Sequence, residues 1–409
     1  MFSKRNNILL TIVVLFLIAG LSVLQIHNIL KFPLTAGFDA HAHADYIIYL
    51  KTLHKLPLPY EGWEMWQAPL YYLVASLFPN LTSVRILHFL SWIVLILSSY
   101  FAFRYLFKKP ILILSASLLT ASLPVVLYAT PGISNEFFSA ALITLALTYY
   151  MANHDLKSLK NKVILGVLLG LSLLAKTTAW LAFAVIIFDL TVRSRKNISL
   201  IVRKTLPVIM LTITIAGWFY AKNVVLYKNP FISSTDFPNY SYTEKPWDRS
   251  LSFFTDLSSI FKLDLFKAHH YSFIGGTYFS WFYDGHNNLV PVQQSSKAGS
   301  LLIMFSVPLA LAFLIGFIKE AKNINDRNRL LLIYPPLLFL AYFFYNLKIP
   351  YYSTVKGVFL VSSVIPFIYF VVRGVEKFVL KHQFIYVLYL VLYELLIIKN
   401  FWIIPTWYR

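Results

Sequence analysis

Apolar runs of membrane-spanning length recur along the whole chain, and short basic segments separate them. A helix needs about 20 apolar residues to cross the hydrocarbon core of a bilayer. The first such run, residues 8–30, directly follows a segment that carries Lys4 and Arg5. Hydrophobic residues make up 58% of the sequence and charged residues only 13%, which excludes an ordinary soluble domain. The sequence therefore predicts an all-α polytopic membrane protein.

The basic residues predict how the spans are oriented. Lys and Arg number 36 against 17 Asp and Glu, and the excess falls between spans, as the positive-inside rule places it on the cytoplasmic face. About eleven spans fit this rule, near residues 8–30, 83–107, 111–128, 137–151, 163–190 (two short helices), 206–220, 301–318, 330–344, 357–372 and 384–404. The N-terminus is then inside and the C-terminus outside. We interpret the basicity as topology and affinity for anionic lipid, and not as nucleic-acid binding.

One lysine interrupts this apolar pattern. Lys176 lies within the segment 175–180, AKTTAW, and a single helix over residues 163–190 would place its charge near mid-membrane, at a cost of several kcal/mol. We expect two shorter helices that turn near the outer face. No internal repeat or separate soluble domain is visible, so we predict one transmembrane domain over residues 1–409. Its first external loop, 31–82, would carry interfacial helices, and the long external loop, 221–299, would form a small external cap.

The first external loop concentrates titratable groups in a chain that has few acids. Asp39, His41, His43 and Asp45 follow one another at spacings of two, and on a helix a spacing of four brings Asp39 beside His43 and His41 beside Asp45. A carboxylate beside a histidine can act as a general base. The same four residues could instead bind zinc or another divalent metal, with Asp39 and His43 as ligands. A polar helix lying at the membrane surface is the third interpretation. The sequence indicates no other cofactor, and the absence of cysteine excludes thiolate sites.

Several basic residues on the predicted outer side oppose the positive-inside bias. They are Arg85, Lys176, Lys222 and Lys356. Together they could hold a phosphate or pyrophosphate group, whereas any one of them alone is more typical of an anchor at the interface. The aromatic run around Trp281 could stack on a sugar or simply pack.

Six motifs, taken in order, resemble those of a known superfamily. They are Asp39 with His43, Asp45 and Tyr46; QAPLYYL at 67–73 with VRIL at 84–87; ISNE at 133–136; GLSLLAKTTA at 170–179; GWFYAKNVVLYKNPF at 217–231; and STVKGVFLVSSVIP at 353–366. Together they cover most of the chain. The chain resembles the GT-C superfamily of polyprenyl-phosphate-dependent glycosyltransferases, close to the protein O-mannosyltransferases and aminoarabinose transferases.

The resemblance implies a hexosyl- or pentosyltransferase that moves a sugar from a polyprenyl-phosphate donor to a lipid, glycan or protein acceptor. The acid after the first span, Asp39, matches the usual general base, with His43 and Asp45 beside it. Arg85, Lys176, Lys222 and Lys356 would bind the donor phosphate. An acceptor or sugar site would draw on Glu61, Glu64, Gln67, Asn135, Glu136 and Trp281. The active face would be extracytoplasmic. A prokaryotic plasma membrane is favoured because the chain has no large lumenal insert or retention signal.

The chain departs from the family pattern at three places. Asp39 is followed by Ala40 where relatives often have Glu, so a second acid would come from Asp45, Glu61, Glu64 or Glu136, or be dispensable. Gln67 stands where many relatives have Lys or His, and Lys222 replaces a common Arg, which loses bidentate geometry but keeps the charge.

Two other function classes fit the composition. One is a polysaccharide polymerase of the O-antigen type, which would depend on basic residues in the large external loop. The other is a transporter or flippase of lipid-linked sugars, in which buried charges line a path through the bundle. The predicted deep spans hold almost no charge, which favours the transferase over the transporter.

Overall fold

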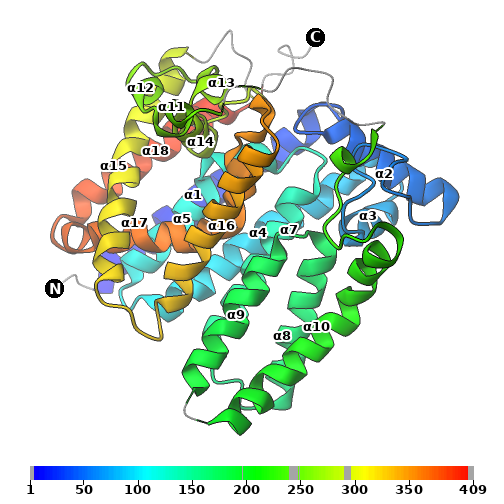
Figure 1. Cartoon of the computed structure of the whole chain (residues 1–409). Helices are drawn as coiled ribbons and strands as arrows, with labels where there is room; N and C mark the ends of the chain where they lie inside the picture. Colours follow the sequence, from blue (N-terminus) through cyan, green and yellow to red (C-terminus); the bar gives the residue numbers. More distant parts are fainter. Residues whose placement is uncertain (1–3, 196, 239–246, 248, 290–295, 404–409) are drawn as a thin grey trace.

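The structure of the protein is a computed structural model, which describes every residue except 1–3, 196, 239–246, 248, 290–295 and 404–409 (Figure 1). Its described residues form helices and connecting loops, with no strand among them. The α-helices are α1 (Lys4–Lys31), α2 (Ala40–Leu53), α3 (Leu70–Ser76), α4 (Leu81–Leu106), α5 (Pro110–Ser122), α6 (Pro124–Ala129), α7 (Asn135–Ala152), α8 (Leu159–Ala175), α9 (Ala179–Ser194), α10 (Ile198–Tyr227), α11 (Leu251–Thr255), α12 (Ser258–Phe261), α13 (Ala268–Tyr271), α14 (Phe273–Phe282), α15 (Ser296–Ala321), α16 (Arg329–Lys348), α17 (Val364–Lys381) and α18 (Gln383–Phe401). The short 3-10 helices are η1 (Ser234–Asp236), η4 (Tyr352–Thr354) and η5 (Gly357–Ser363). The all-α prediction is confirmed.

Within the described residues, seven helical segments are long and apolar enough to cross a membrane. They comprise α1, α4, α10, α15, α16, α18 and the segment formed by η4, η5 and α17. This confirms an integral membrane protein. Helices also occupy the other predicted places, at α5 with α6, α7, α8 and α9, but they are shorter or less apolar. The count of eleven spans and their orientation therefore stay predictions.

One predicted span is divided by a proline. The sequence predicts one helix over residues 111–128, but α5 ends at Ser122 and α6 begins at Pro124. A proline has no amide hydrogen to donate and its ring clashes with the preceding turn. The break therefore follows from the residue type.

The predicted turn at Lys176 is confirmed. Helix α8 ends at Ala175, Lys176 is extended, and α9 begins at Ala179. Helices α8 and α10 pack closely because α8 carries Gly166 and Gly170 on the face toward α10: a Cβ on Gly170 would lie 2.7 Å from the Cβ of Ile215. Small residues at this spacing let two membrane helices approach each other.

The short helices lie at one end of the bundle. In Figure 1, α11–α14 and α2 lie toward the end of the bundle opposite the loop between α15 and α16. Residues 221–299, for which we predict the external cap, contain η1 and α11–α14. Residues 239–246, 248 and 290–295 of this loop lie outside the described residues. Helices α2 and α3 occur in the loop 31–82, where interfacial helices are predicted.

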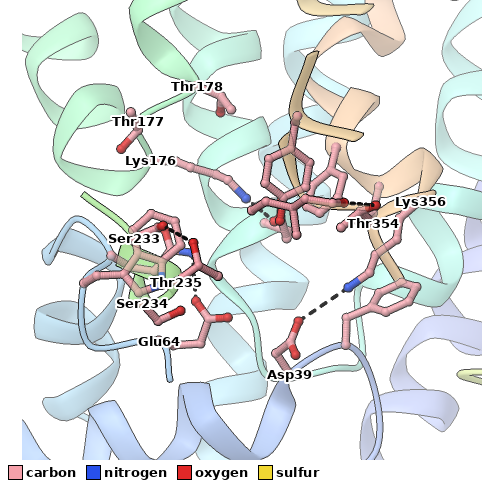
Figure 2. A pocket seen from close by; sticks show the side chains of 18 of the residues that line it. Asp39, Glu64, Lys176, Thr177, Thr178, Ser233, Ser234, Thr235, Thr354 and Lys356 are labelled. Atoms are coloured by element: carbon pink, nitrogen blue, oxygen red, sulfur yellow. Dashed lines mark hydrogen bonds and ion pairs between the residues drawn. The ribbon is translucent and has the colours of Figure 1, made fainter. Parts of the chain in front are cut away.

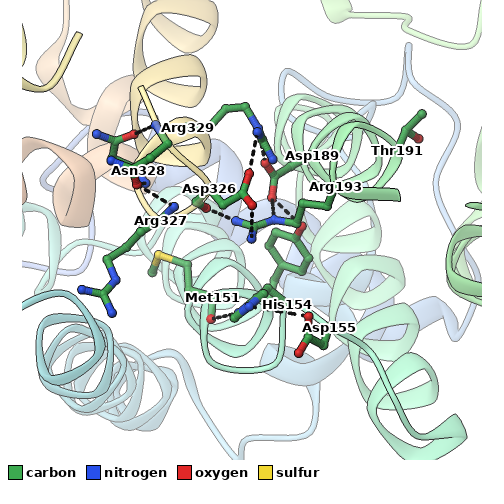
Figure 3. A network of polar contacts seen from close by, with 12 residues as sticks. Met151, His154, Asp155, Asp189, Thr191, Arg193, Asp326, Arg327, Asn328 and Arg329 are labelled. Atoms are coloured by element: carbon green, nitrogen blue, oxygen red, sulfur yellow. Dashed lines mark hydrogen bonds and ion pairs between the residues drawn. The ribbon is translucent and has the colours of Figure 1, made fainter. Parts of the chain in front are cut away.

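A buried carboxylate ties three helices together at the opposite end (Figure 3). Asp189 on α9 is fully buried. Its two oxygens lie 2.6 Å from the Nε atoms of Arg193 and Arg329, and the hydroxyl of Tyr150 on α7 donates to it over 2.5 Å. Because these groups come from α7, α9 and α16, the network fixes the mutual position of the three helices.

Candidate active site

The predicted site residues are divided between one cavity and other places in the fold. The cavity has a volume of about 370 Å³, which is within the usual range for small-ligand sites. It forms where the first external loop, the start of α7, the turn between α8 and α9, η1, the end of α16 and the η4–η5 segment meet (Figure 2). The predicted residues that line it are Asp39, His43, Glu64, Gln67, Glu136, Lys176 and Lys356.

Asp39 is held in the cavity by a left-handed backbone conformation. It is the N-cap residue of α2 with φ 53°, and Gly37, two residues earlier, has φ 108°. A non-glycine residue in this region costs roughly 1 kcal/mol or more, and such conformations cluster at functional sites. The turn points the carboxylate toward Lys356, whose Nζ lies 3.4 Å from the Asp39 Oδ2.

The charge of Asp39 is stabilised by its neighbours. The ammonium of Lys356 lowers the pKa of Asp39, and burial opposes this effect. A hydrogen bond from Trp63 also lowers the pKa. Asp39 is therefore an ionised carboxylate at neutral pH, as an acceptor of protons must be.

The two lysines of the cavity are each paired with a carboxylate and lie against one aromatic ring. Lys176 pairs with Glu136, as Lys356 pairs with Asp39. The Nζ atoms of both lysines lie 5.6 Å from the centre of the Phe359 ring. Both lysines are more than nine-tenths buried. Two ammonium groups near the same ring form a site suited to an anionic phosphate. Such a phosphate would compete with the carboxylates of Asp39 and Glu136 for the two lysines.

A chain of amides supports a second carboxyl group. The side-chain amide of Asn135 donates to the Gln67 Oε1 over 3.2 Å, and the Gln67 amide donates to the Glu64 Oε2 over 2.8 Å. Burial raises the pKa of Glu64 to about 8, and the negative charge of Asp39 adds to the shift. Glu64 is therefore mostly protonated at neutral pH and can donate a hydrogen bond into the cavity. Asn135 lies behind the wall and acts through Gln67.

His43 lies in the cavity as a neutral ring. Its Nδ1 is 2.7 Å from the hydroxyl oxygen of Tyr72, and burial lowers the pKa of His43 to about 3. A metal site at Asp39 and His43 would need further ligands, but the described residues contain no group of three His, Asp or Glu side chains arranged to hold a metal ion. The Asp39 carboxylate already has an ammonium partner. The residues present therefore do not fit a divalent metal site.

Besides Asn135, three predicted residues of the acid and sugar sites lie outside the cavity. The side chain of Asp45 is 51% exposed, and its Oδ2 lies 3.8 Å from the Nε2 of His41. Asp45 follows Asp39 by six residues, and this spacing turns it to a different face of α2. Glu61 accepts a hydrogen bond of 2.9 Å from the hydroxyl of Tyr49. Trp281 is buried in the core, where its ring packs against Phe367.

Two predicted phosphate ligands also lie elsewhere, so the four cations do not converge. Arg85 is buried and donates to the backbone carbonyl of Ile29 over 2.8 Å, at the C-terminal end of α1, where positive charge is favourable. Lys222 lies on the ring of Phe219 on α10, 5.3 Å from its centre, and does not line the cavity.

Several cavity residues were not predicted from the sequence. Hydroxyl groups line the cavity at several places, from Thr177, Thr178, Ser233, Ser234, Thr235 and Thr354 (Figure 2). Thr177 and Thr178 belong to the AKTTA segment already singled out by its lysine. The run of hydroxyls at 233–235 begins two residues after the NPF sequence at 229–231, and this proximity is the only feature of the sequence that could have indicated it. Nothing in the sequence around Trp63 and Phe359 indicated that these two residues line the cavity.

Comparison with known proteins gives a likeness in structure only. No protein-family model matches the chain, and no curated protein matches it. Among solved structures, the chain is similar to the Archaeoglobus fulgidus oligosaccharyltransferase in its apo form, with a TM-score of 0.52 and 13% identity over 96% of this chain and 55% of that one. The fold is GT-C-like.

The second similar structure is the same oligosaccharyltransferase tethered to an acceptor peptide that contains an NVT sequon. Its TM-score is 0.50 at 16% identity, over 96% of this chain and 54% of that one. This chain therefore spans about half the length of the oligosaccharyltransferase that it matches. ArnT from Cupriavidus metallidurans bound to undecaprenyl phosphate gives a TM-score of 0.42 at 15% identity, over 92% of this chain and 78% of that one, which is too low to define a common fold. The sequence-level resemblance to the GT-C superfamily is confirmed for the fold.

Proposed function

We propose that the protein is a membrane glycosyltransferase that moves a sugar from a polyprenyl-phosphate donor to an acceptor at the extracytoplasmic face. The observation that carries this proposal is the joint placement of a carboxylate, Asp39, and two buried lysines, Lys176 and Lys356, in one cavity. A carboxylate can receive a proton from the acceptor, and two ammonium groups can bind a phosphate leaving group. The GT-C-like fold is consistent with this chemistry.

In the proposed reaction, Asp39 accepts the proton of an acceptor hydroxyl or amine as that group attacks the anomeric carbon of the sugar. A bond forms between the acceptor atom and the anomeric carbon, and the bond from this carbon to the phosphate oxygen breaks. The polyprenyl phosphate leaves with the electron pair, and Lys176 and Lys356 stabilise its charge. Direct displacement inverts the anomeric centre. NMR of the product tests this step, since retained configuration would contradict it.

Donor binding would also activate the base. Without a ligand, Lys356 is paired with Asp39 and Lys176 with Glu136. A phosphate that draws Lys356 toward itself weakens the first pair, and the pKa of Asp39 then rises from its lowered value. A carboxylate with a higher pKa is a stronger base. The site would thus become active when the donor is in place.

The remaining cavity groups suit a sugar and its acceptor. Neutral Glu64, Gln67 and the hydroxyls at 233–235 offer hydrogen-bond donors and acceptors to sugar hydroxyls, and the apolar helices would surround the prenyl tail. The acceptor would be a lipid, a glycan or a protein. The similar oligosaccharyltransferase holds a tethered acceptor peptide, so peptides belong among the acceptors to be tried.

The proposal is tested by sugar transfer in detergent from radiolabelled polyprenyl-phosphate donors. Lys176→Gln should raise the donor KM about tenfold or more, because a charge-assisted contact is worth roughly 1.5–3 kcal/mol. Lys222→Gln is the matched control, since its lysine lies outside the cavity, and it should keep the wild-type KM. Equal effects of the two variants would contradict the phosphate site. No transfer by folded wild-type protein with any such donor would instead favour a polymerase, which extends lipid-linked glycans, or a transporter, which only moves them.

A further inference from the structure

A second cavity lies at the other end of α8 and is strongly basic. Its volume is about 200 Å³. Four cationic side chains line it, Lys157, Lys162, Arg203 and Lys204, with a single carboxylate, Asp155. The lining therefore carries an excess of positive charge even if Asp155 is fully ionised.

Lys162 is the unusual member of this cavity. It is only 8% exposed, although a buried ammonium normally needs a paired anion. Among the described residues, no carboxylate forms an ion pair with Lys162, Arg203 or Lys204. The carboxylate of Asp155 lies 3.6 Å from the exposed Lys157. The buried ammonium of Lys162 thus has no carboxylate partner in the described part of the chain.

The backbone adds to the positive potential. Helices α8 and α10 both begin at this cavity, at Leu159 and Ile198, and pack side by side (Figure 1). The N-terminal end of a helix carries a partial positive charge that favours anions. Because a helix rises about 1.5 Å per residue, Lys162 lies roughly 21 Å along α8 from Lys176. The basic cavity therefore lies toward the end of the bundle opposite the candidate active site, and the predicted topology places that end on the cytoplasmic side.

We propose that this cavity binds the phosphate group of an anionic ligand, with Lys162 as the buried counter-charge and Arg203 and Lys204 at the rim. The chemistry fits a phosphate on an anionic lipid headgroup, since basic pockets between helices at the cytoplasmic side of a membrane bind such headgroups. It fits equally a soluble phosphate. The inference does not depend on the proposed transferase activity.

The experiment measures thermal unfolding in neutral detergent with two probes, phosphatidylglycerol and inorganic phosphate at constant ionic strength. A ligand that binds the native state raises Tm. In Lys162→Gln, the probe concentration needed for a given rise should increase about fivefold, the effect expected from the loss of one lysine near the surface. Arg203→Gln, which changes an exposed residue and should not disturb folding, should act in the same direction. Lys160→Gln is the control, because it removes an exposed charge of the same helix turn that does not line the cavity.

The outcomes separate the sources of the phosphate. Stabilisation by phosphatidylglycerol that depends on Lys162 and Arg203, but not on Lys160, supports a lipid ligand. Stabilisation by inorganic phosphate with the same dependence supports a soluble one. Equal responses of all the variants, or no response of the wild-type protein to either probe, would overturn the proposal.

Discussion

Replacing Glu64 with glutamine should change how the stability of the protein depends on pH. Glu64 is 6% exposed, and burial raises the pKa of its carboxyl from 4.5 to about 8. The folded protein therefore holds a proton between these pH values that the unfolded chain releases. Glutamine keeps the size of the protonated carboxyl and can still bond to Gln67, but it does not titrate.

The sign and size of the effect follow from linkage. Since the folded state binds more protons than the unfolded state between pH 4.5 and about 8, the wild-type free energy of unfolding falls as pH rises through this window. Each pH unit well inside the window costs about 1.4 kcal/mol. From about pH 5 to about pH 7, the wild-type protein should lose about 2.5 kcal/mol relative to Glu64→Gln.

Thermal unfolding of both proteins in detergent at several pH values measures this difference. We expect the Tm of Glu64→Gln to exceed that of wild type by a margin that widens with pH. Glu61→Gln, a change of an exposed acid in the same loop, should not reproduce the widening. A gap between wild type and Glu64→Gln that stays constant from pH 5 to pH 7 would refute the assignment of a protonated Glu64.

Two further predictions concern stability. Gly170→Val should destabilise the protein by about 1–3 kcal/mol through overpacking, because a Cβ there would lie 2.7 Å from Ile215. Gly20→Val, whose Cβ would have 4.0 Å to its nearest neighbour, is the control, and equal Tm losses would contradict the close packing of α8 on α10. Asp189→Asn should cost about 3 kcal/mol, because it leaves two arginines without their buried carboxylate. An unchanged denaturation midpoint would show that this network does not join the helices.

The helical architecture could be predicted largely from the sequence, because the bilayer imposes one length on apolar helices. The turn after α8 was predictable from the cost of burying a charge, since a continuous helix would have placed the ammonium of Lys176 within the membrane. The division between α5 and α6 at Pro124 was missed because residues 111–128 are apolar enough to be one span. An apolar window records hydrophobicity and not the missing amide hydrogen of a proline.

The candidate site was predictable only in part. Positive charge on the predicted outer side, against the positive-inside bias, singled out Lys176 and Lys356, and both line the cavity. The same argument singled out Arg85 and Lys222, which lie elsewhere. Charge bias indicates the end of the bundle at which a residue lies, but not the direction in which its side chain points.

The other features of the candidate site depend on contacts between residues far apart in the sequence, or on tertiary packing. Asp39 and Lys356 are 317 positions apart in the sequence, and no local pattern relates them. The shifted pKa of Glu64 has burial as its main cause, which depends on tertiary packing. The hydroxyls at 233–235 come from a polar loop, where serine and threonine are common for reasons of turn chemistry.

The most direct test of the account is the rate of sugar transfer by Asp39→Asn compared with Asp45→Asn, with donor binding measured separately for each variant. Both changes remove one carboxylate from the α2 region, but Asp39 lines the cavity and Asp45 points away from it with its side chain 51% exposed. We predict that Asp39→Asn lowers turnover by at least about a hundredfold, as loss of a general base does, while donor binding persists and Asp45→Asn stays active. Full turnover by Asp39→Asn would contradict the role of Asp39 as the base.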